Sequence, residues 1–464
     1  MASTSRPARR SARRTVAVAS LAALVGTTVA ASAAIGDDGG DNSAAAAAAI
    51  VAGKARSVIM LLGDGMGDSE ITIARNYQVG ANGRLAMDSL PMTGEYTTYS
   101  LQKAAPHLPD YVTDSAASGT GWATGNKTYN GAISVLPDGT TPAPTILELA
   151  KKAGFATGNV STAEIEDATP AVLDSHISNR DCKGPDETTT LCASEATEAG
   201  GRGSIAEQMV EPESSPDVVL GGGLAYFQET IKGGAYQGDT VLDKAKDKGY
   251  KVVTDADGLG SVGPDDRVLG LFAPNNMDLE WVGPAAKHKG TKPQECKTND
   301  DRSDSQPHLS DMATKAIDLL DAKTKGSSKG FFLQIEGASI DKQDHAANVC
   351  GQIGETVEFD KAIKAALDYQ KDNPDTLVVV TADHGHTSQI VEANTVTPGI
   401  SATLITKDGA PMEVSYATAK KGESQQHTGT EVRIAAGGPQ ASNVLGITNQ
   451  TDLFYTFKRA LGLK

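Results

Sequence analysis

The sequence predicts an α/β fold: a doubly wound, mostly parallel central sheet flanked by helices. Three short apolar runs, at residues 58–62, 331–335 and 377–380, suit strands buried on both faces, and segments with helical periodicity lie between them. An acid or an imidazole follows each run, namely Asp64, Glu336, and Asp383 with His384. Because ligands collect beyond the carboxyl ends of parallel strands, we expect a metal site at that edge of the sheet.

The other elements follow in chain order. Helical spacing predicts helices at residues 144–153, 311–320, 355–369 and 451–464. Apolar runs bounded by turn residues predict strands at residues 155–160, 217–220, 267–272 and 402–406. Residues 274–308 are polar and irregular, so no regular structure is predicted there, and residues 388–426 are predicted to form a loop-rich insertion.

The N-terminus has the features of an export signal. Arginines at positions 9, 10, 13 and 14 precede a short apolar run at residues 16–29, and an Ala-x-Ala pattern ends at Ala33. Residues 1–33 are therefore predicted to be the signal peptide of a secreted protein, by either the twin-arginine or the Sec route. Residues 34–54, rich in Ala, Gly and Asp, are predicted to be a linker, and residues 55–464 the folded catalytic domain.

The charge balance excludes some partners. The 464-residue chain has a formal charge of -16, and removal of the five arginines in residues 1–33 takes this to -21. A surface this acidic disfavours binding to nucleic acid or to an anionic membrane. No other stretch is apolar enough to cross a bilayer, so no membrane partner is expected. An anionic substrate would have to be attracted by local cations.

The four cysteines, Cys182, Cys192, Cys296 and Cys350, all follow the predicted signal peptide. This usage fits an oxidising compartment, in which disulfides persist. Four cysteines allow three pairings, and spacing alone does not choose among them.

Several side chains have the chemistry of a catalytic site. Asp341 and His345 would share one face of a helix, which is a spacing that zinc ligands use, and Glu336 could serve a harder ion such as magnesium. Ser115 begins a run of small residues that predicts a helix start, where it could act beside a bound anion or serve only as an N-cap. Arg180 carries a fork that fits phosphate, although a surface position is the alternative.

Six motifs resemble those of the bacterial alkaline phosphatases of the dimeric, two-zinc and one-magnesium type. They occur in that family's order and span most of residues 57–464. They are GDGMGDSEI around Asp64, TDSAASGTGWATG around Ser115, TGNVSTAEIEDATPA around Asp167, QIEGASIDKQDHAAN around Asp341, TADHGHTSQI around Asp383, and QHTGTEVRIAAGGP around His427.

The resemblance implies a role for each matching residue. It implies two zinc ions and one magnesium ion per chain: one zinc on Asp341, His345 and His427, the second on Asp64, Asp383 and His384, and magnesium on Asp64, Asp167, Thr169 and Glu336. It implies that Ser115 is the nucleophile, that Arg180 clamps phosphate, and that Asp114, Lys342 and His386 support them. It also implies disulfides Cys182–Cys192 and Cys296–Cys350 and a homodimer. Gly119, Gly121, Gly385 and the long linker depart from the family's pattern.

The function implied by the resemblance is that of a secreted alkaline phosphatase. Such an enzyme hydrolyses phosphate monoesters of broad range through a phosphoserine intermediate, and inorganic phosphate is both its product and an inhibitor. Two other functions are open. A phosphodiesterase or sulfatase would lack the magnesium residues or carry a Cys/Ser-x-Pro-x-Arg signature, which none of the four cysteines begins. A zinc-storage protein would need neither Ser115 nor Arg180.

Overall fold

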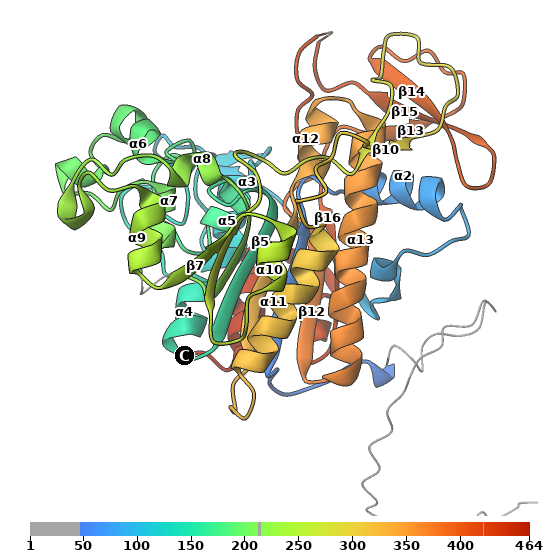
Figure 1. The fold of residues 1–464 in the computed structure, drawn as a ribbon. Helices are drawn as coiled ribbons and strands as arrows, with labels where there is room; N and C mark the ends of the chain where they lie inside the picture. Colours follow the sequence, from blue (N-terminus) through green and yellow to red (C-terminus); the bar gives the residue numbers. More distant parts are fainter. Residues whose placement is uncertain (1–46, 212–214, 421) are drawn as a thin grey trace, which may run out of the picture.

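A computed structural model describes residues 47–211, 215–420 and 422–464 (Figure 1). The predicted signal peptide, residues 1–33, lies outside the described residues, as does the predicted linker up to residue 46. The end of the linker contacts the domain: Ala49 packs against the main core, and Val51 forms a bridge with Pro439.

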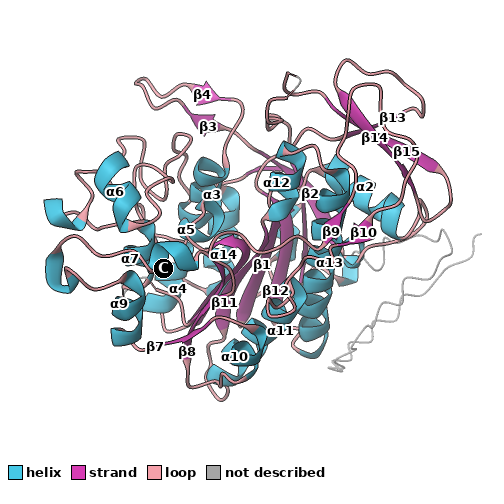
Figure 2. Ribbon diagram, turned by 45° about the horizontal axis from the view of Figure 1, so that its top comes forward, coloured by secondary structure: helices cyan, strands magenta, loops and turns pink. Residues whose placement is uncertain are grey.

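A ten-stranded sheet runs through the centre of the molecule (Figures 1 and 2), in the order β17-β2-β16-β12-β1-β11-β5-β6-β8-β7. Its bounds are β1 Ser57–Gly63, β2 Met92–Thr97, β5 Ala156–Glu164, β6 Val218–Gly222, β7 Tyr250–Val253, β8 Arg267–Leu271, β11 Phe331–Gly337, β12 Thr376–Ala382, β16 Val432–Gly437 and β17 Gly446–Asn449. Only β16 pairs antiparallel with its neighbours, β12 and β2, among the described strands of this sheet. The predicted α/β fold with a mostly parallel sheet is therefore confirmed.

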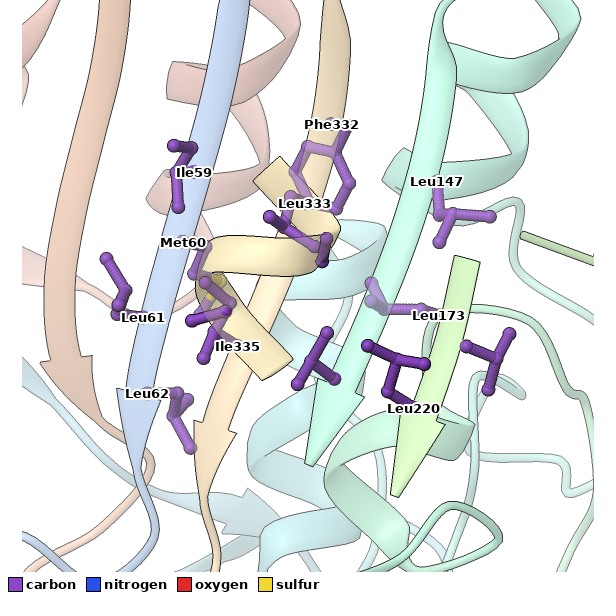
Figure 3. Packing of buried hydrophobic residues seen from close by; sticks show 14 of the residues in the cluster. Ile59, Met60, Leu61, Leu62, Leu147, Leu173, Leu220, Phe332, Leu333 and Ile335 are labelled. Atoms are coloured by element: carbon purple, nitrogen blue, oxygen red, sulfur yellow. The ribbon is translucent and has the colours of Figure 1, made fainter. Parts of the chain in front are cut away.

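The four central strands, β5, β11, β1 and β12, are the best buried. Every residue of these strands is buried, as expected for parallel strands covered on both faces. Their register is regular, with Leu62 of β1 beside Glu336 of β11 and Thr381 of β12. Figure 3 shows Ile59 to Leu62 of β1 beside Phe332, Leu333 and Ile335 of β11 in one core.

Helices cover both faces of the sheet. Neighbouring residues of a strand point to opposite faces, and Phe331 contacts Tyr369 of α13 whereas Phe332 contacts Phe457 of α14. The helices α13 and α14 therefore lie on opposite sides of β11. The helical segments are α2 Asp68–Gln78, α3 Ser115–Thr124, α4 Ile146–Lys152, α5 Ala168–Ala171, α6 Pro185–Leu191, α7 Ile205–Met209, α8 Leu224–Phe227, α9 Val241–Asp247, α10 Ala256–Gly260, α11 Leu309–Lys323, α12 Ser339–His345, α13 Val349–Asp372 and α14 Asp452–Leu461.

A smaller sheet stands beside the main one, at the upper right of Figure 1. It contains β13 Gln389–Val391, β14 Ile400–Ile405 and β15 Pro411–Tyr416, so the predicted insertion at residues 388–426 holds the expected strand, as β14, and two more. Residues 274–308, predicted to be irregular, contain two short paired strands, β9 Trp281–Val282 and β10 Lys297–Thr298. The disulfide between Cys296 and Cys350 ties this segment to α13.

A third pair of strands, β3 Ser100–Leu101 and β4 Pro109–Asp110, forms a hairpin that projects from the body (Figure 2). Across the described ranges, none of the helices combines the length and the apolar character that a membrane crossing requires.

Phe332 offers a test of the core. Replacing Phe332 by Ala should lower the free energy of unfolding by about 3–5 kcal/mol, because the fully buried ring packs against Phe457 and leaves a cavity when removed. Phe332→Leu keeps most of the apolar volume and should cost about half as much or less. Urea unfolding would measure both, with Val396→Ala, at a site 69% exposed, as a control expected to change stability by no more than about 0.5 kcal/mol. An unchanged midpoint for Phe332→Ala would contradict this description of the core.

Candidate active site

The carboxyl ends of β1, β11 and β12 bring the predicted acids together. Asp64 and Asp383 directly follow β1 and β12, and Glu336 is the penultimate residue of β11. The turn after β1 is tied to the turn after β12, since the Gly65 amide donates to Asp383 Oδ1 at 2.9 Å. Gly65 has φ +64°, and a Cβ there would lie 3.0 Å from the His386 ring. A glycine is thus required where these two turns meet.

The helix α12 follows β11 after a single residue and carries two of the predicted ligands. Asp341 and His345 share one face of this helix, as predicted, with His345 Nε2 3.4 Å from Asp341 Oδ2. His427 reaches the same carboxylate from the segment before β16, with its Nε2 3.2 Å from Asp341 Oδ1. Asp341, His345, His427 and His386 thus present ligand atoms within 4.8 Å of one another.

Hydrogen bonds to the imidazole Nδ1 atoms indicate which histidines can bind a metal. A neutral imidazole carries one N–H, and donating it to a backbone carbonyl leaves the other nitrogen as a free ligand. Three histidines place Nδ1 against a carbonyl and turn Nε2 into the site. The pairs are His345 with Gln425 O, His384 with Gly385 O at 3.3 Å, and His427 with Thr113 O at 3.1 Å.

His386 has the opposite arrangement. The Thr387 amide donates to His386 Nδ1 at 2.9 Å, so the proton of the neutral ring lies on Nε2. This Nε2 is 3.0 Å from Asp341 Oδ1. The nitrogen that carries the proton therefore faces Asp341 and can help to orient that carboxylate, as an outer residue supports a metal ligand.

A second group consists of Asp64, Asp383 and His384. His384 Nε2 lies 3.2 Å from Asp383 Oδ2 and 3.5 Å from Asp64 Oδ1, and all three side chains are almost fully buried. Burial lowers the pKa of His384 well below its ordinary value, so the ring is neutral and its Nε2 can act as a ligand. Ser115 Oγ is 3.5 Å from the same Nε2, which places the predicted nucleophile at this group.

The two groups have the donor chemistry of a metal centre. Within the described part of the chain, no hydrogen-bond partner reaches the buried atoms Asp64 Oδ1, Asp341 Oδ1 or Asp383 Oδ2. Burial, followed by repulsion from Asp383 and Asp341, raises the pKa of Asp64 well above its ordinary value, and burial raises the pKa of Asp383 to about 6. Divalent cations would satisfy these oxygens and remove the repulsion, and nitrogen with oxygen donors suits zinc.

Ser115 is the first residue of α3, and Asp114 is the N-cap. Asp114 Oδ1 accepts from the Ala117 amide at 2.9 Å, so the alternative in which Ser115 serves only as the N-cap is wrong. The other oxygen of Asp114 accepts from the Gly131 amide at 2.9 Å and from Arg180 Nη1 at 3.2 Å. One carboxylate thus both starts the helix that carries Ser115 and holds Arg180 beside it.

Arg180 lies at the site and not on the open surface, since its side chain is only 25% exposed. Its second nitrogen, Nη2, donates to Asp167 Oδ1 at 3.0 Å, and Lys342 Nζ donates to Asp167 Oδ2 at 2.8 Å. Burial alone would raise the pKa of Asp167, but Lys342, Lys183 and Arg180 hold it well below its ordinary value. Two predicted cations are therefore held in place by one ionised carboxylate.

The residues predicted for magnesium are gathered less tightly. Among the described residues, the carboxylates of Asp64, Asp167 and Glu336 do not form a third group at the spacing of the other two. Glu336 accepts a 2.5 Å hydrogen bond from Ser161 Oγ, and Thr169 Oγ1 is buried with no partner in the described ranges. An oxygen-only set of this kind suits a hard cation such as magnesium.

Lys183 was not singled out in the sequence. It follows Arg180 by three residues, and its Nζ lies 3.4 Å from Asp167 Oδ1 and closer still to Glu164 Oε2. The sequence could have pointed to Lys183, because it is a second basic residue close to Arg180, on the other side of Cys182.

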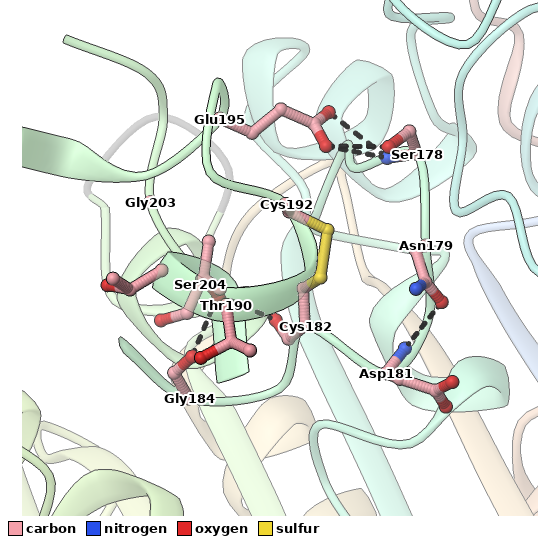
Figure 4. Close-up of a disulfide and its surroundings, with 12 residues drawn as sticks. Ser178, Asn179, Asp181, Cys182, Gly184, Thr190, Cys192, Glu195, Gly203 and Ser204 are labelled. Atoms are coloured by element: carbon pink, nitrogen blue, oxygen red, sulfur yellow. Dashed lines mark hydrogen bonds between the residues drawn. A yellow bond between two sulfur atoms is a disulfide. The ribbon is translucent and has the colours of Figure 1, made fainter. Parts of the chain in front are cut away.

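The disulfide between Cys182 and Cys192 braces the segment that carries these two cations (Figure 4). Ser178, two residues before Arg180, donates through its amide and its hydroxyl to Glu195 (Figure 4). The structure thus contains both of the disulfides implied by the resemblance, and no free cysteine occurs in the described ranges.

Comparisons with known proteins agree with this geometry. The family model described as alkaline phosphatase matches residues 55–423 and 402–463. The chain is 54% identical to the alkaline phosphatase of Escherichia coli over 417 residues, covering 88% of this chain and 87% of that protein. It is 50% identical to the streptomycin-6-phosphate phosphatase of Streptomyces griseus over 414 residues, covering 88% and 91%. The solved alkaline phosphatase of the Antarctic bacterium TAB5 superposes with a TM-score of 0.65 at 25% identity, covering 89% of this chain and 99% of that one.

Metal binding should stabilise the fold. Adding zinc to chelator-treated protein should raise its thermal unfolding temperature, because an ion that binds only the folded state adds about 2.7 kcal/mol at a hundredfold excess over Kd. The unfolding temperature of Asp341→Asn should rise less on addition of zinc, because the substitution disrupts one of the two ligand groups. Asp368→Asn, an exposed partner of Lys364, is the matched control and should gain as much as the unaltered protein. An equal gain for Asp341→Asn would refute the assignment of that group.

Proposed function

Because this chain belongs to the alkaline phosphatase family and is a phosphoric monoester hydrolase, we propose that it hydrolyses phosphate monoesters of broad range through a phosphoserine intermediate on Ser115. The observation that carries the proposal is the position of Ser115 Oγ. It lies 3.5 Å from His384 Nε2 in the second ligand group, and the neighbouring Asp114 holds Arg180. The proposed nucleophile thus lies beside one ligand group and next in sequence to the acid that holds Arg180, which supports the proposal.

The proposed cofactors are two zinc ions and one magnesium ion. Asp341, His345 and His427 would hold the first zinc, Asp64, Asp383 and His384 the second, and Asp64, Asp167, Thr169 and Glu336 the magnesium. Bound there, the cations would neutralise the phosphate dianion, favour the ionised form of the attacking hydroxyl and stabilise the departing alkoxide.

The protein's own residues would perform the following steps. Ser115 Oγ attacks phosphorus, a new O–P bond forms, and the bond from phosphorus to the ester oxygen breaks. The alcohol leaves with the proton that the Ser115 hydroxyl gave up. A water molecule then attacks phosphorus, the bond from phosphorus to Ser115 Oγ breaks, a proton of the water returns to Oγ, and inorganic phosphate is released. Arg180 would donate to two non-bridging oxygens throughout, held in place by Asp114 and Asp167. Lys342, held on Asp167, would add positive charge, and His386 would keep Asp341 oriented.

A broad substrate range follows from what the site contacts. The groups assigned a role above would act on the phosphate or hold its metals, and none of them is assigned to the alcohol. The names of the relatives support this, because a streptomycin-6-phosphate phosphatase and an alkaline phosphatase are 50% and 54% identical to the same chain. Inorganic phosphate would then act as product and inhibitor.

Secretion and homodimerisation belong to the same proposal. The two disulfides support an oxidising compartment, and residues 1–33 carry the pattern of a signal peptide. The homodimer is proposed by likeness to the family.

Ser115→Ala should abolish formation of the phosphoenzyme and lower kcat by about 10³-fold or more, because no other hydroxyl replaces Oγ at this position. Trapping the phosphoserine by acid quench and mass spectrometry would measure the first effect, and steady-state kinetics the second. Ser118→Ala is the matched control in the same helix, and it should still form the phosphoenzyme. Full activity in Ser115→Ala would remove Ser115 from the mechanism.

The substrate class is tested with two aryl esters. The metal-loaded enzyme should hydrolyse p-nitrophenyl phosphate much faster than bis-p-nitrophenyl phosphate, since Arg180 and the ligand groups suit a dianion with free oxygens. A preference for the bis-ester would identify a phosphodiesterase, and no turnover of either ester together with tight zinc binding would identify a storage protein.

A further inference from the structure

Lys183 is largely buried among the charged groups of the site, but it is neither a predicted metal ligand nor a predicted phosphate-binding residue. Its side chain is 15% exposed, and its Nζ forms a very close ion pair with Glu164 and lies 3.4 Å from Asp167 Oδ1. Its Nζ also lies 5.9 Å from the centre of the Tyr226 ring. Glu164 ends β5, and Asp167 caps α5, so Lys183 bridges the end of a central strand and the helix that follows it.

The backbone around Lys183 is fixed independently of its side chain. Its carbonyl accepts from the Ala206 amide of α7 at 3.0 Å, and the carbonyl of Cys182 accepts from the Ile205 amide at 3.1 Å. The disulfide at Cys182 anchors the same segment. The backbone therefore holds the ammonium group of Lys183 close to Glu164 and Asp167.

Ion pairs link the charged side chains at this end of the site, and Lys183 takes part in two of these pairs. Three acids, Asp114, Glu164 and Asp167, face three bases, Arg180, Lys183 and Lys342. Without Lys183 the two remaining bases would face three carboxylates.

Glu164 is the acid whose charge Lys183 compensates. Its side chain is 11% exposed, and Lys183 is its ion-pair partner. An unpaired carboxylate at that depth would attract the nearest cations, and those near Asp167 are Arg180 and Lys342. If Arg180 or Lys342 turned toward Glu164, its attraction for a phosphate dianion would be weaker.

We propose that Lys183 is a positioning residue for phosphate binding: it neutralises Glu164 and shares Asp167, so that Arg180 and Lys342 keep their charge for the phosphate. This inference rests on the proposed function. It extends the phosphate-binding machinery to a residue that need not touch the substrate.

The test uses the metal-loaded holoenzyme, with metal content checked for every variant. Binding of inorganic phosphate is measured by titration calorimetry, and KM and kcat with p-nitrophenyl phosphate. Lys183→Met keeps the length of the side chain and removes the charge. It should raise the Kd of phosphate and KM about tenfold and change kcat by less than about threefold, because loss of one nearby unit charge acts on binding.

Two further variants separate charge from structure. Lys183→Arg keeps the charge, and it should bind phosphate within about threefold of the unaltered enzyme. Lys183→Met combined with Glu164→Gln restores the balance of charge, and it should recover most of the lost affinity. Lys232→Met is the matched control, since Lys232 forms an exposed ion pair with Asp186 at 2.6 Å, and it should leave the Kd unchanged.

The inference is overturned if Lys183→Met binds phosphate as the unaltered enzyme does, if its weaker binding is explained by lost metal, or if the double variant stays as weak as Lys183→Met. These results differ from a failure of the proposed function. In that case the unaltered enzyme itself would neither hydrolyse p-nitrophenyl phosphate nor bind phosphate.

Discussion

The parallel register of β5, β11, β1 and β12 is the constraint on which the site depends. Four adjacent strands that run in one direction end at one edge, so the residues just beyond them must meet there. The acids at these ends are buried, and this burial, followed by their mutual repulsion, raises the pKa of Asp64. Such a gathering costs free energy, and the apolar packing of the strands below offsets that cost. The core thus holds together carboxylates that would separate in a looser structure.

Backbone carbonyls from distant segments complete the site. Thr113 precedes the helix of Ser115, whereas Gln425 belongs to the insertion that carries the smaller sheet. Each carbonyl accepts a hydrogen bond from the Nδ1–H of one histidine and so leaves Nε2 facing the ligand group. The insertion is therefore a structural part of the site. The electrostatics around Asp167 also depend on distant parts of the chain, because cations from two segments, Arg180 and Lys183 in one and Lys342 in the other, share this carboxylate.

Much of the fold was predictable because its central strands are continuous apolar runs. The strands β1, β11 and β12 were found for this reason, and each extends only one or two residues beyond its predicted bounds. The strand β5 continues to Glu164, four residues past the predicted end, because polar residues such as Ser161 are buried through a bond to Glu336. Strand β2 was missed, since MTGEYT is partly exposed and polar. A local sequence pattern does not predict the burial of a polar residue whose hydrogen-bond partner is distant in the sequence.

The residues of the candidate site were recognised from motifs, but their arrangement was not. The two readings of Ser115 could be separated only by seeing that Asp114 accepts the bond from Ala117. The distinction between His386 and the other histidines depends on which atom faces each Nδ1, and the sequence does not contain that information. Lys183 was missed because its environment is built from β5, α5 and α7 together.

Gly119 links two parts of the site mechanically. It lies one turn beyond Ser115 in α3, and a Cβ there would come within 2.9 Å of both methyl groups of Val172, at the end of the short helix capped by Asp167. The helix that begins at Ser115 and the short helix capped by Asp167 therefore pack closely at Gly119, where no side chain fits. At Gly121 an added Cβ would make only an ordinary 3.5 Å contact with Gln450. An alanine would therefore fit at position 121, whereas at position 119 it would push the two helices apart without altering any proposed metal ligand.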